Sequence, residues 1–393
     1  MSRAGRLLTA AALALVGPLL AGTAALAADA PGSDREEKGV PIQVVIPDSS
    51  RVELDSAVLT WGINAEVGGG AFAGGCNFLS AGAAGNAERS RVWTEDDGFY
   101  KTRDGNVSIE KPDANGTYGT PTWATKCQDP QGKAVVASRA ESRSQNRVVI
   151  GGGTGVVDHA TGTAQIQWRG SFTVVFYGGM TYWTATDPTL TVEADGTGTL
   201  TATGSGYGAD MTDTGRWVPL RPRPITLATF HDVSVAAPDS VLVTPDYLGV
   251  AVDTRGGAAQ TERTEANADY WGAFPQDFVD FQQETGQSAY WYASGGSRDR
   301  AKVAEQFAVG YGAPVSPPGQ DVPGGGAAGG GTPAPDNPLN PRPAGLNPLP
   351  VTVNRPAGGG APLRRTRAAP RGTRARRSRR PSTRPRCSLP VRG

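Results

Sequence analysis

Residues 164–208 constrain the fold more than any other stretch, because apolar side chains there occupy every second position between turn residues. The alternating residues are Ile166, Trp168, Phe172, Val174 and Phe176. A period of two is typical of β-strands with one buried face. Gly178-Gly179, Asp187-Pro188 and Asp195-Gly196 separate the runs and favour chain reversal. The stretch therefore predicts an antiparallel meander.

The same kind of pattern extends in both directions. Runs rich in β-branched and aromatic residues predict strands within 41–63, 134–150, 216–235, 240–254 and 287–296. At 275–285 the period changes: Phe274, Phe278 and Phe281 are four and three residues apart, and Gly286 suits the end of a helix. A second short helix is expected within 301–309. Residues 41–312 thus predict a mainly β domain, an antiparallel β-sandwich with one or two short helices.

The first 27 residues have the features of a secretion signal. Arg3 and Arg6 precede an apolar run over 7–20, and Ala25-Leu26-Ala27 forms a small-residue cleavage site. No later run reaches the roughly 18 apolar residues of a membrane-spanning helix. We expect a secreted or cell-surface-associated protein, with a polar leader over 28–40 and no transmembrane segment apart from the signal.

The C-terminal part differs sharply in composition. Residues 313–360 are dominated by Pro and Gly, which predicts a disordered linker. Residues 361–393 carry 12 Arg and no acid, so the remainder holds 26 basic against 37 acidic residues, a balance of −11. The disordered tail is interpreted either as a basic arm for an anionic surface or as the product of a frameshifted gene. The acidic remainder does not favour nucleic acid as a partner.

Cysteines and histidines are few. Cys76 and Cys127 are the two cysteines of the predicted domain, and an oxidising compartment favours a disulfide between them. His159 and His231 are interpreted as structural residues, exposed or hydrogen-bonded. The chain lacks the usual catalytic and metal-binding motifs, so we predict a non-enzymatic protein without metal ligands.

Aromatic residues supply the candidate binding site. They form two clusters: Phe176, Tyr177, Tyr182 and Trp183, then Tyr290, Trp291 and Tyr292. Because successive strand residues point to opposite faces, some of these rings are expected outside the core. Two interpretations stay open: half-buried packing, or an apolar slot for a flat ligand.

Several sequence words resemble the HtaA domain of actinobacterial cell-surface haem-uptake proteins. They are VLTWGI (58–63), WRGSFTVVFYGG (168–179), DPTLTV (187–192), LTATGSGYGADM (200–211) and TLATFHDV (226–233). Residues 273–296 resemble a segment that often follows this domain, so the resemblance covers roughly 53–296. It implies an antiparallel β-sandwich, export and binding of haem or a related ligand.

The resemblance also implies a haem-ligating tyrosine and a supporting histidine. Their positions fall near Gly70 and on Gly179, so neither ligand is present. The leading hypothesis is a secreted or cell-surface HtaA-like binding module, with haem or another flat apolar ligand as partner. The alternatives are an envelope-structural or adhesive protein that binds a cell-envelope component through exposed aromatics, and a secreted hydrolase.

Overall fold

A computed structural model describes residues 50–72, 75–209 and 215–318. These residues belong to one compact unit. The predicted signal (1–27), the leader (28–40), the tail (361–393) and most of the linker (313–360) lie outside the described residues. None of the helices among the described residues has the length and apolar character needed to cross a membrane.

Most of the secondary structure is antiparallel β, which confirms the predicted fold class. The strands are β1 (Arg51–Trp61), β2 (Phe78–Ala81), β3 (Arg103–Asp104), β4 (Val107–Pro112), β5 (Tyr118–Gly119), β6 (Arg147–Asp158), β7 (Thr163–Gln167), β8 (Ser171–Phe176), β9 (Thr181–Val192), β10 (Gly198–Ala209), β11 (Trp217–Phe230), β12 (Ser240–Val243) and β13 (Phe307–Gly310). One α-helix, α1 (Gln276–Thr285), and short 3-10 helices η1 (Ala65–Gly68), η2 (Glu95–Asp97), η3 (Tyr177–Gly179), η4 (Glu265–Asn267), η5 (Ser288–Tyr290) and η6 (Asp299–Lys302) complete the described elements.

Hydrogen bonds join the strands in the order β11-β10-β9-β7-β6-β1-β13-β12. The strands β6 and β9 diverge along their length. β7 lies between residues 154–158 of β6 and 189–192 of β9, whereas β4 pairs with 147–150 of β6 and β8 pairs with 181–186 of β9. Trp168 fills the fork, and its indole Nε1 donates a hydrogen bond to the Ala57 carbonyl at 2.9 Å. The predicted meander thus becomes the centre of the sheet.

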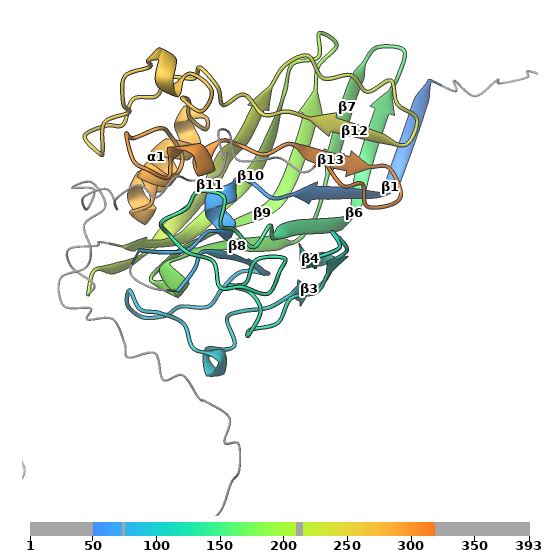
Figure 1. The fold of residues 1–393 in the computed structure, drawn as a ribbon. Helices are drawn as coiled ribbons and strands as arrows, with labels where there is room; N and C mark the ends of the chain where they lie inside the picture. Colours follow the sequence, from blue (N-terminus) through green and yellow to red (C-terminus); the bar gives the residue numbers. More distant parts are fainter. Residues whose placement is uncertain (1–49, 73–74, 210–214, 319–393) are drawn as a thin grey trace, which may run out of the picture. The chain divides into compact units, whose positions relative to one another are not determined.

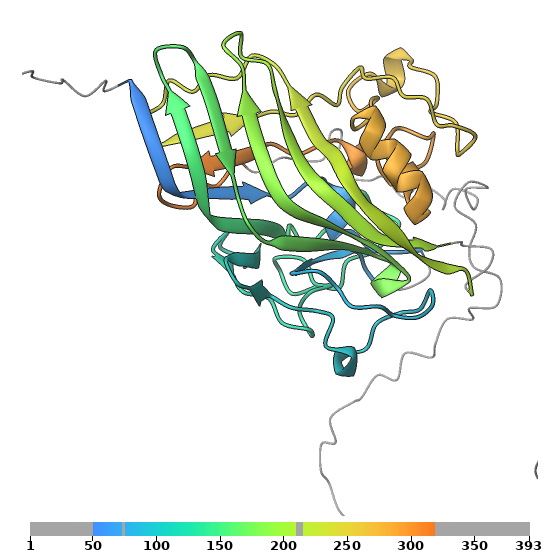
Figure 2. The same ribbon diagram turned by 180° about the vertical axis from the view of Figure 1, so that it is seen from behind.

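The sheet folds over itself through β1. Register shifts between Leu54 and Leu59 bend this strand, as an extra residue in a ladder does. Its C-terminal half then pairs with β13, which pairs with β12. These three strands cross in front of the long strands in Figure 1 and behind them in Figure 2. Side chains of both layers share one hydrophobic core, in which the Phe230 and Phe307 rings lie 6.1 Å apart.

Residues 82–146, here called the covering segment, pack against the other face of β8 and β9. They include β3, β4 and β5 and appear below β8 in Figure 1. The predicted disulfide joins Cys76 to Cys127 within a second core cluster, with 5.6 Å between the Cα atoms. The Tyr182 hydroxyl donates to the Gly85 carbonyl at 2.6 Å and accepts from the Ala87 N–H at 3.0 Å. The disulfide and this tyrosine hold the covering segment to the sheet.

The helix α1 lies beside β10 and β11 (Figures 1 and 2). Phe278 and Phe281 are buried, and Gly286 closes the helix in a left-handed conformation, as its spacing predicts. The Asp277 side chain on its first turn accepts a hydrogen bond from the Thr226 N–H of β11 at 2.8 Å. The helix therefore covers part of an edge strand that would otherwise be open.

Candidate functional site

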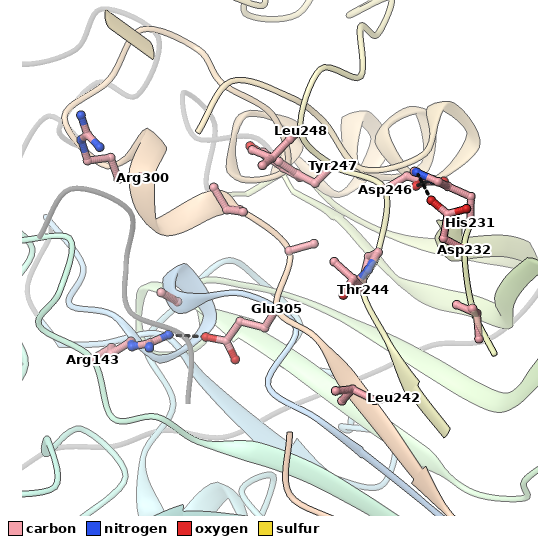
Figure 3. Close-up of a pocket in the computed structure, with 15 residues that line it drawn as sticks. Arg143, His231, Asp232, Leu242, Thr244, Asp246, Tyr247, Leu248, Arg300 and Glu305 are labelled. Carbon is pink, nitrogen blue, oxygen red and sulfur yellow. Dashed lines mark hydrogen bonds and ion pairs between the residues drawn. The ribbon is translucent and has the colours of Figure 1, made fainter. Parts of the chain in front are cut away.

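A cavity of about 610 Å³ opens beside the C-terminal end of β12. Three segments form its walls: 231–233 after β11, 242–248 at and after the end of β12, and 303–305 before β13. Figure 3 shows their side chains around one space, with Leu242 and Thr244 between His231 on one side and Glu305 on the other. Residues far apart in sequence meet here because β12 and β13 pair next to the end of β11.

An imidazole and two carboxylates form one end of the cavity. His231 Nδ1 hydrogen-bonds to the Asp246 side chain, and His231 Nε2 lies 3.5 Å from the Asp232 carboxylate. The side chain of Asp232 is 93% exposed, whereas that of Asp246 is 25% exposed. The Asp246 N–H also donates to the Thr229 carbonyl at 2.7 Å, which fixes its backbone to the end of β11. This end presents exposed negative charge beside the histidine.

Arginine–carboxylate pairs form the opposite end. Arg143 of the covering segment pairs with Glu305, whose side chain is 21% exposed. Arg300 donates to Asp269 at 2.8 Å, and its guanidinium lies 4.1 Å from the centre of the Tyr270 ring. Each arginine thus faces an opposite charge, so this end is polar but close to electrically balanced.

The part between these ends is mainly apolar. Leu242 and Leu248 are 44% and 56% exposed, which is high for leucine, and Val303 and Ala304 line the same space. Tyr247 is buried behind them, and burial raises the pKa of its hydroxyl well above the ordinary value. The cavity therefore offers apolar contact flanked by hydrogen-bonding and charged groups.

The cavity contains elements of acid–base chemistry but no assembled nucleophile. Thr244 carries an exposed hydroxyl in the cavity, and that hydroxyl accepts a hydrogen bond from Gln306 at 2.7 Å. His231 makes its described contacts with carboxylates. Among the described residues, no three His, Cys, Asp or Glu side chains are grouped so that they could hold a metal ion.

The seven aromatic residues predicted as a binding site lie elsewhere, inside the protein. Phe176, Tyr177, Tyr182, Trp183, Tyr290, Trp291 and Tyr292 are all at most 9% exposed. The structure does bring the two sequence clusters together: the Phe176 and Tyr290 ring centres are 4.1 Å apart, and those of Trp183 and Trp291 are 5.9 Å apart. Ligand binding by these residues stays a prediction, but the expectation that some rings lie outside the core is wrong.

The reason is that both faces of β9 are covered. Trp183 faces α1 and contacts Phe278 and Phe281. Its neighbour Tyr182 points the opposite way, and its ring centre lies 4.9 Å from that of Trp93 in the covering segment. Alternation correctly placed the two rings on opposite faces, but each face has its own apolar cluster.

The HtaA resemblance places the haem ligands near Gly70 and at Gly179, and both glycines are closely packed in this structure. A Cβ atom on Gly179 would lie 2.2 Å from the Trp93 ring, and one on Gly70 would lie 2.5 Å from the Ala137 nitrogen. Both obstacles belong to the covering segment. Side chains larger than hydrogen therefore do not fit at either position without displacement of that segment.

His159 and His231 differ in setting. His159 Nδ1 lies 2.6 Å from the Val235 carbonyl oxygen, and its ring is 6.5 Å from that of Tyr311, which agrees with a structural role. His231 belongs to the cavity, a placement that sequence reasoning missed. Asp232, next to His231 in the sequence FHDV, could have indicated a polar site, but the pairing of His231 with Asp246 depends on the fold.

Comparison with known proteins adds little. No protein-family model matches the chain, and no curated protein matches it. Among solved structures, the C-terminal domain of HtaA from Corynebacterium glutamicum is 12% identical, with a TM-score of 0.30 over 66% of this chain and 97% of that domain. A likeness of that size carries no argument about family or ligand. The fold and cavity define a disulfide-containing, mainly antiparallel β domain.

Proposed function

We propose that the described domain is a secreted or cell-surface, non-catalytic binding module whose ligand occupies the cavity beside β12. The observation that carries this proposal is the cavity itself. Its volume of about 610 Å³ lies within the ordinary range for small-ligand sites, about 300–1,000 Å³. Exposed leucines between two polar ends suit a ligand with both apolar and polar groups.

Two features of the sequence support an extracellular setting. The first 27 residues have the pattern of a secretion signal. The disulfide between Cys76 and Cys127 suits an oxidising compartment. The proposal therefore places the cavity outside the cell, where it meets soluble ligands or envelope components.

Haem bound through the family's two positions is disfavoured. The tyrosine position falls near Gly70 and the histidine position on Gly179, and the covering segment occupies the space beside both glycines. Haem handling through this cavity is retained as one form of the proposal, because an exposed imidazole and exposed leucines line it. The envelope-adhesion alternative has fewer rings to use than expected: among the described residues, the aromatics counted as exposed are Phe72 and Tyr118.

The test is a ligand panel measured against a blocked cavity. We would titrate the full secreted chain with hemin, soluble cell-wall fragments, small saccharides and short peptides, and follow binding by calorimetry. Thr244→Trp places a large ring in the cavity from an exposed position, and Val218→Trp is the matched control at an exposed position on β11, outside the cavity lining. The proposal expects at least one ligand to bind the control and to bind the blocked variant at least about tenfold more weakly.

Other outcomes are equally clear. Binding that Thr244→Trp leaves unchanged would remove the cavity from the proposal. If the Soret band remains that of free hemin while another ligand binds in the cavity, haem is excluded as the ligand and the rest of the proposal stands. Turnover of a saccharide or peptide that is lost in His231→Ala would favour the hydrolase alternative.

A further inference from the structure

The strand β12 ends the hydrogen-bonded order of the sheet. It pairs with β13 along one side, and no other strand among the described residues pairs with it. An edge strand presents unpaired N–H and C=O groups that can pair with another chain. The orientation of these groups therefore decides whether β12 offers a docking edge.

The described hydrogen bonds fix that orientation. The Tyr311 N–H donates to the Asp239 carbonyl across the β12–β13 pair. Alternate residues of an antiparallel strand bond to the same neighbour, so Val241 and Val243 also face β13. The backbone groups of Ser240 and Leu242 consequently point away from it. No hydrogen bond to the N–H or C=O of Leu242 occurs elsewhere in the described part of the chain.

The other terminal strand of the sheet, β11, is treated differently. The Asp277 carboxylate of α1 accepts the hydrogen bond of the Thr226 N–H on β11, and the helix packs along that strand. Covering an edge with a helix is a common way to prevent unwanted strand pairing. The edge of β12 has no such cover among the described residues, and Leu242 on it is 44% exposed.

The surroundings of this edge indicate the chemistry of a partner. Leu242 and Leu248 would contact apolar side chains. Asp232, whose carboxylate is 93% exposed, and Asp246 would attract positive charge. At the far end, Arg143 and Glu305 already form an ion pair. An extended chain with apolar and basic residues in alternation matches both the strand period of two and these side chains.

We propose that β12 binds an extended peptide by strand addition, with the outward N–H and C=O of Leu242 paired to the peptide backbone and a basic peptide residue beside Asp232 and Asp246. This inference rests on the proposed function, because it assigns an occupant to the same cavity. With two outward residues on a four-residue strand, backbone pairing fixes register and side chains in the cavity supply the remaining contact.

The probe is the hexapeptide acetyl-Lys-Val-Lys-Val-Lys-Val-amide, added to the 15N-labelled full chain. We expect saturable shifts of the Leu242 amide and slower hydrogen exchange at that amide. Leu242→Pro removes the outward N–H, at a position where an edge strand tolerates proline, and also replaces the leucine side chain; it should weaken binding about tenfold. Leu242→Ala keeps the N–H and should weaken binding about threefold or less.

Matched peptides test the same contact without altering the protein. Methylation of alternate peptide nitrogens blocks one edge of the peptide, so one of the two alternating patterns should abolish binding while the other leaves it intact. This comparison decides the matter even if Leu242→Pro fails to fold. A peptide with Glu in place of each Lys should bind at least about tenfold more weakly, because its carboxylates would face Asp232 and Asp246.

Three results would overturn the inference. Equal binding by the Leu242→Pro and Leu242→Ala variants would exclude the hydrogen bond from the Leu242 N–H that the inference requires. A concentration-dependent dimer, measured by light scattering and abolished by Leu242→Pro, would assign the edge to a second copy of this chain. If the peptide does not bind the wild-type chain but another ligand still binds in the cavity, the peptide proposal is wrong and the proposed function stands.

Discussion

Gly179 adopts a backbone conformation that side chains avoid, with φ of +124°, and the Trp93 ring occupies the space where a Cβ would lie. The covering segment therefore selects glycine at a position where the HtaA resemblance implies histidine. A side chain at residue 179 would therefore have to displace the Trp93 ring.

We expect Gly179→Ala to destabilise the domain by about 2–4 kcal/mol, through both the positive φ and the clash with Trp93. Urea denaturation with matched m-values measures the change. Gly105→Ala is the control, since φ is +59° there and nothing lies within 4 Å of the added Cβ; its cost should be about 1 kcal/mol. Equal costs for the two variants would contradict the close packing over Gly179.

Lys126 makes stability depend on pH. Its ammonium lies 3.3 Å from the centre of the Trp123 ring, and burial lowers its pKa from 10.5 to about 8. The folded protein therefore releases this proton at lower pH than the unfolded chain does. Where the unfolded state binds more protons, stability rises with pH, so this lysine's contribution should increase from about pH 8 toward 10.5.

The check is a comparison of urea midpoints at pH 7 and pH 9.5 for the wild-type and Lys126→Met chains. The urea midpoint of the wild type, measured relative to that of Lys126→Met, should be higher at pH 9.5 than at pH 7. A pH-independent difference would mean that the Trp123 ring holds the proton on Lys126 as firmly as water does.

Residue-level prediction from sequence succeeded where one local rule decided the outcome. The spacing of Phe278 and Phe281 placed both on the buried face of one helix. It failed for Tyr182 because alternation assigns a face but does not show what lies over it. The cover is the covering segment, whose scattered aromatics have no regular period.

At the scale of elements, the disulfide between Cys76 and Cys127 is the main covalent constraint on the covering segment. The two residues are 51 apart in sequence. In the loop-entropy account, a bridge of that span contributes about 4 kcal/mol. Cys76 is completely buried, so its sulfur also contributes to the packing of the second core cluster.

Replacement of both cysteines by serine should therefore lower the free energy of unfolding by about 3–5 kcal/mol. Urea denaturation of the variant, and of the wild type with and without reductant, measures this change. Cys127→Ala with Cys76→Ala is the companion variant, which removes the bridge without placing a hydroxyl at the completely buried position 76. A loss under about 1 kcal/mol in the alanine pair would contradict the assigned role of the bridge.

Elements whose local pattern was long and regular were predicted well. The helix α1 and the strands β7, β8, β9 and β10 fall where the sequence indicated. The reversal expected at Asp187-Pro188 is wrong: the pair lies inside β9, where Asp187 has a φ of +52° and interrupts the strand locally without turning it back. In place of the strand, turn and strand expected over 134–150, isolated bridges form at Ala134 and Arg143 and β6 continues to Asp158. Over 287–296 the predicted strand is instead η5 followed by a single bridge between Ala273 and Tyr292. Over 301–309 the expected helix is divided into η6 and β13. These short aromatic or apolar runs are buried by tertiary packing, which overrides a weak local preference.

At the scale of the whole molecule, the candidate site could not be derived from the sequence. Its members come from 231–248 and 300–305, with Arg143 from the covering segment and Ala65 from η1. None of them forms a motif, and they meet because the sheet bends back at β1 and brings β12 to the end of β11. The bend itself depends on register shifts in β1 that the alternation pattern does not reveal.

A buried ion pair joins three parts of this architecture. Arg298 donates to Glu66 of η1 at 2.6 Å, and both side chains are at most 6% exposed. The same guanidinium donates to the carbonyls of Ala137 and Arg139 in the covering segment at 3.3 and 2.8 Å. Loss of the arginine would leave a buried carboxylate and two carbonyls without this donor, at a cost of about 3–5 kcal/mol.

We therefore expect Arg298→Met to destabilise the domain by about 3–5 kcal/mol and to speed proteolysis within 134–144. Glu66→Gln in the same background should restore part of the stability, because it removes the uncompensated charge. Urea denaturation and limited proteolysis with mapped cleavage sites measure the two effects. The exposed pair Arg51–Glu53, with side chains 53% and 73% exposed, is the control, and Arg51→Met should change stability by under about 1 kcal/mol. If Arg298→Met matched that control, the covering segment would be held by its apolar contacts and the disulfide, and the cavity wall that carries Arg143 would not depend on the buried pair.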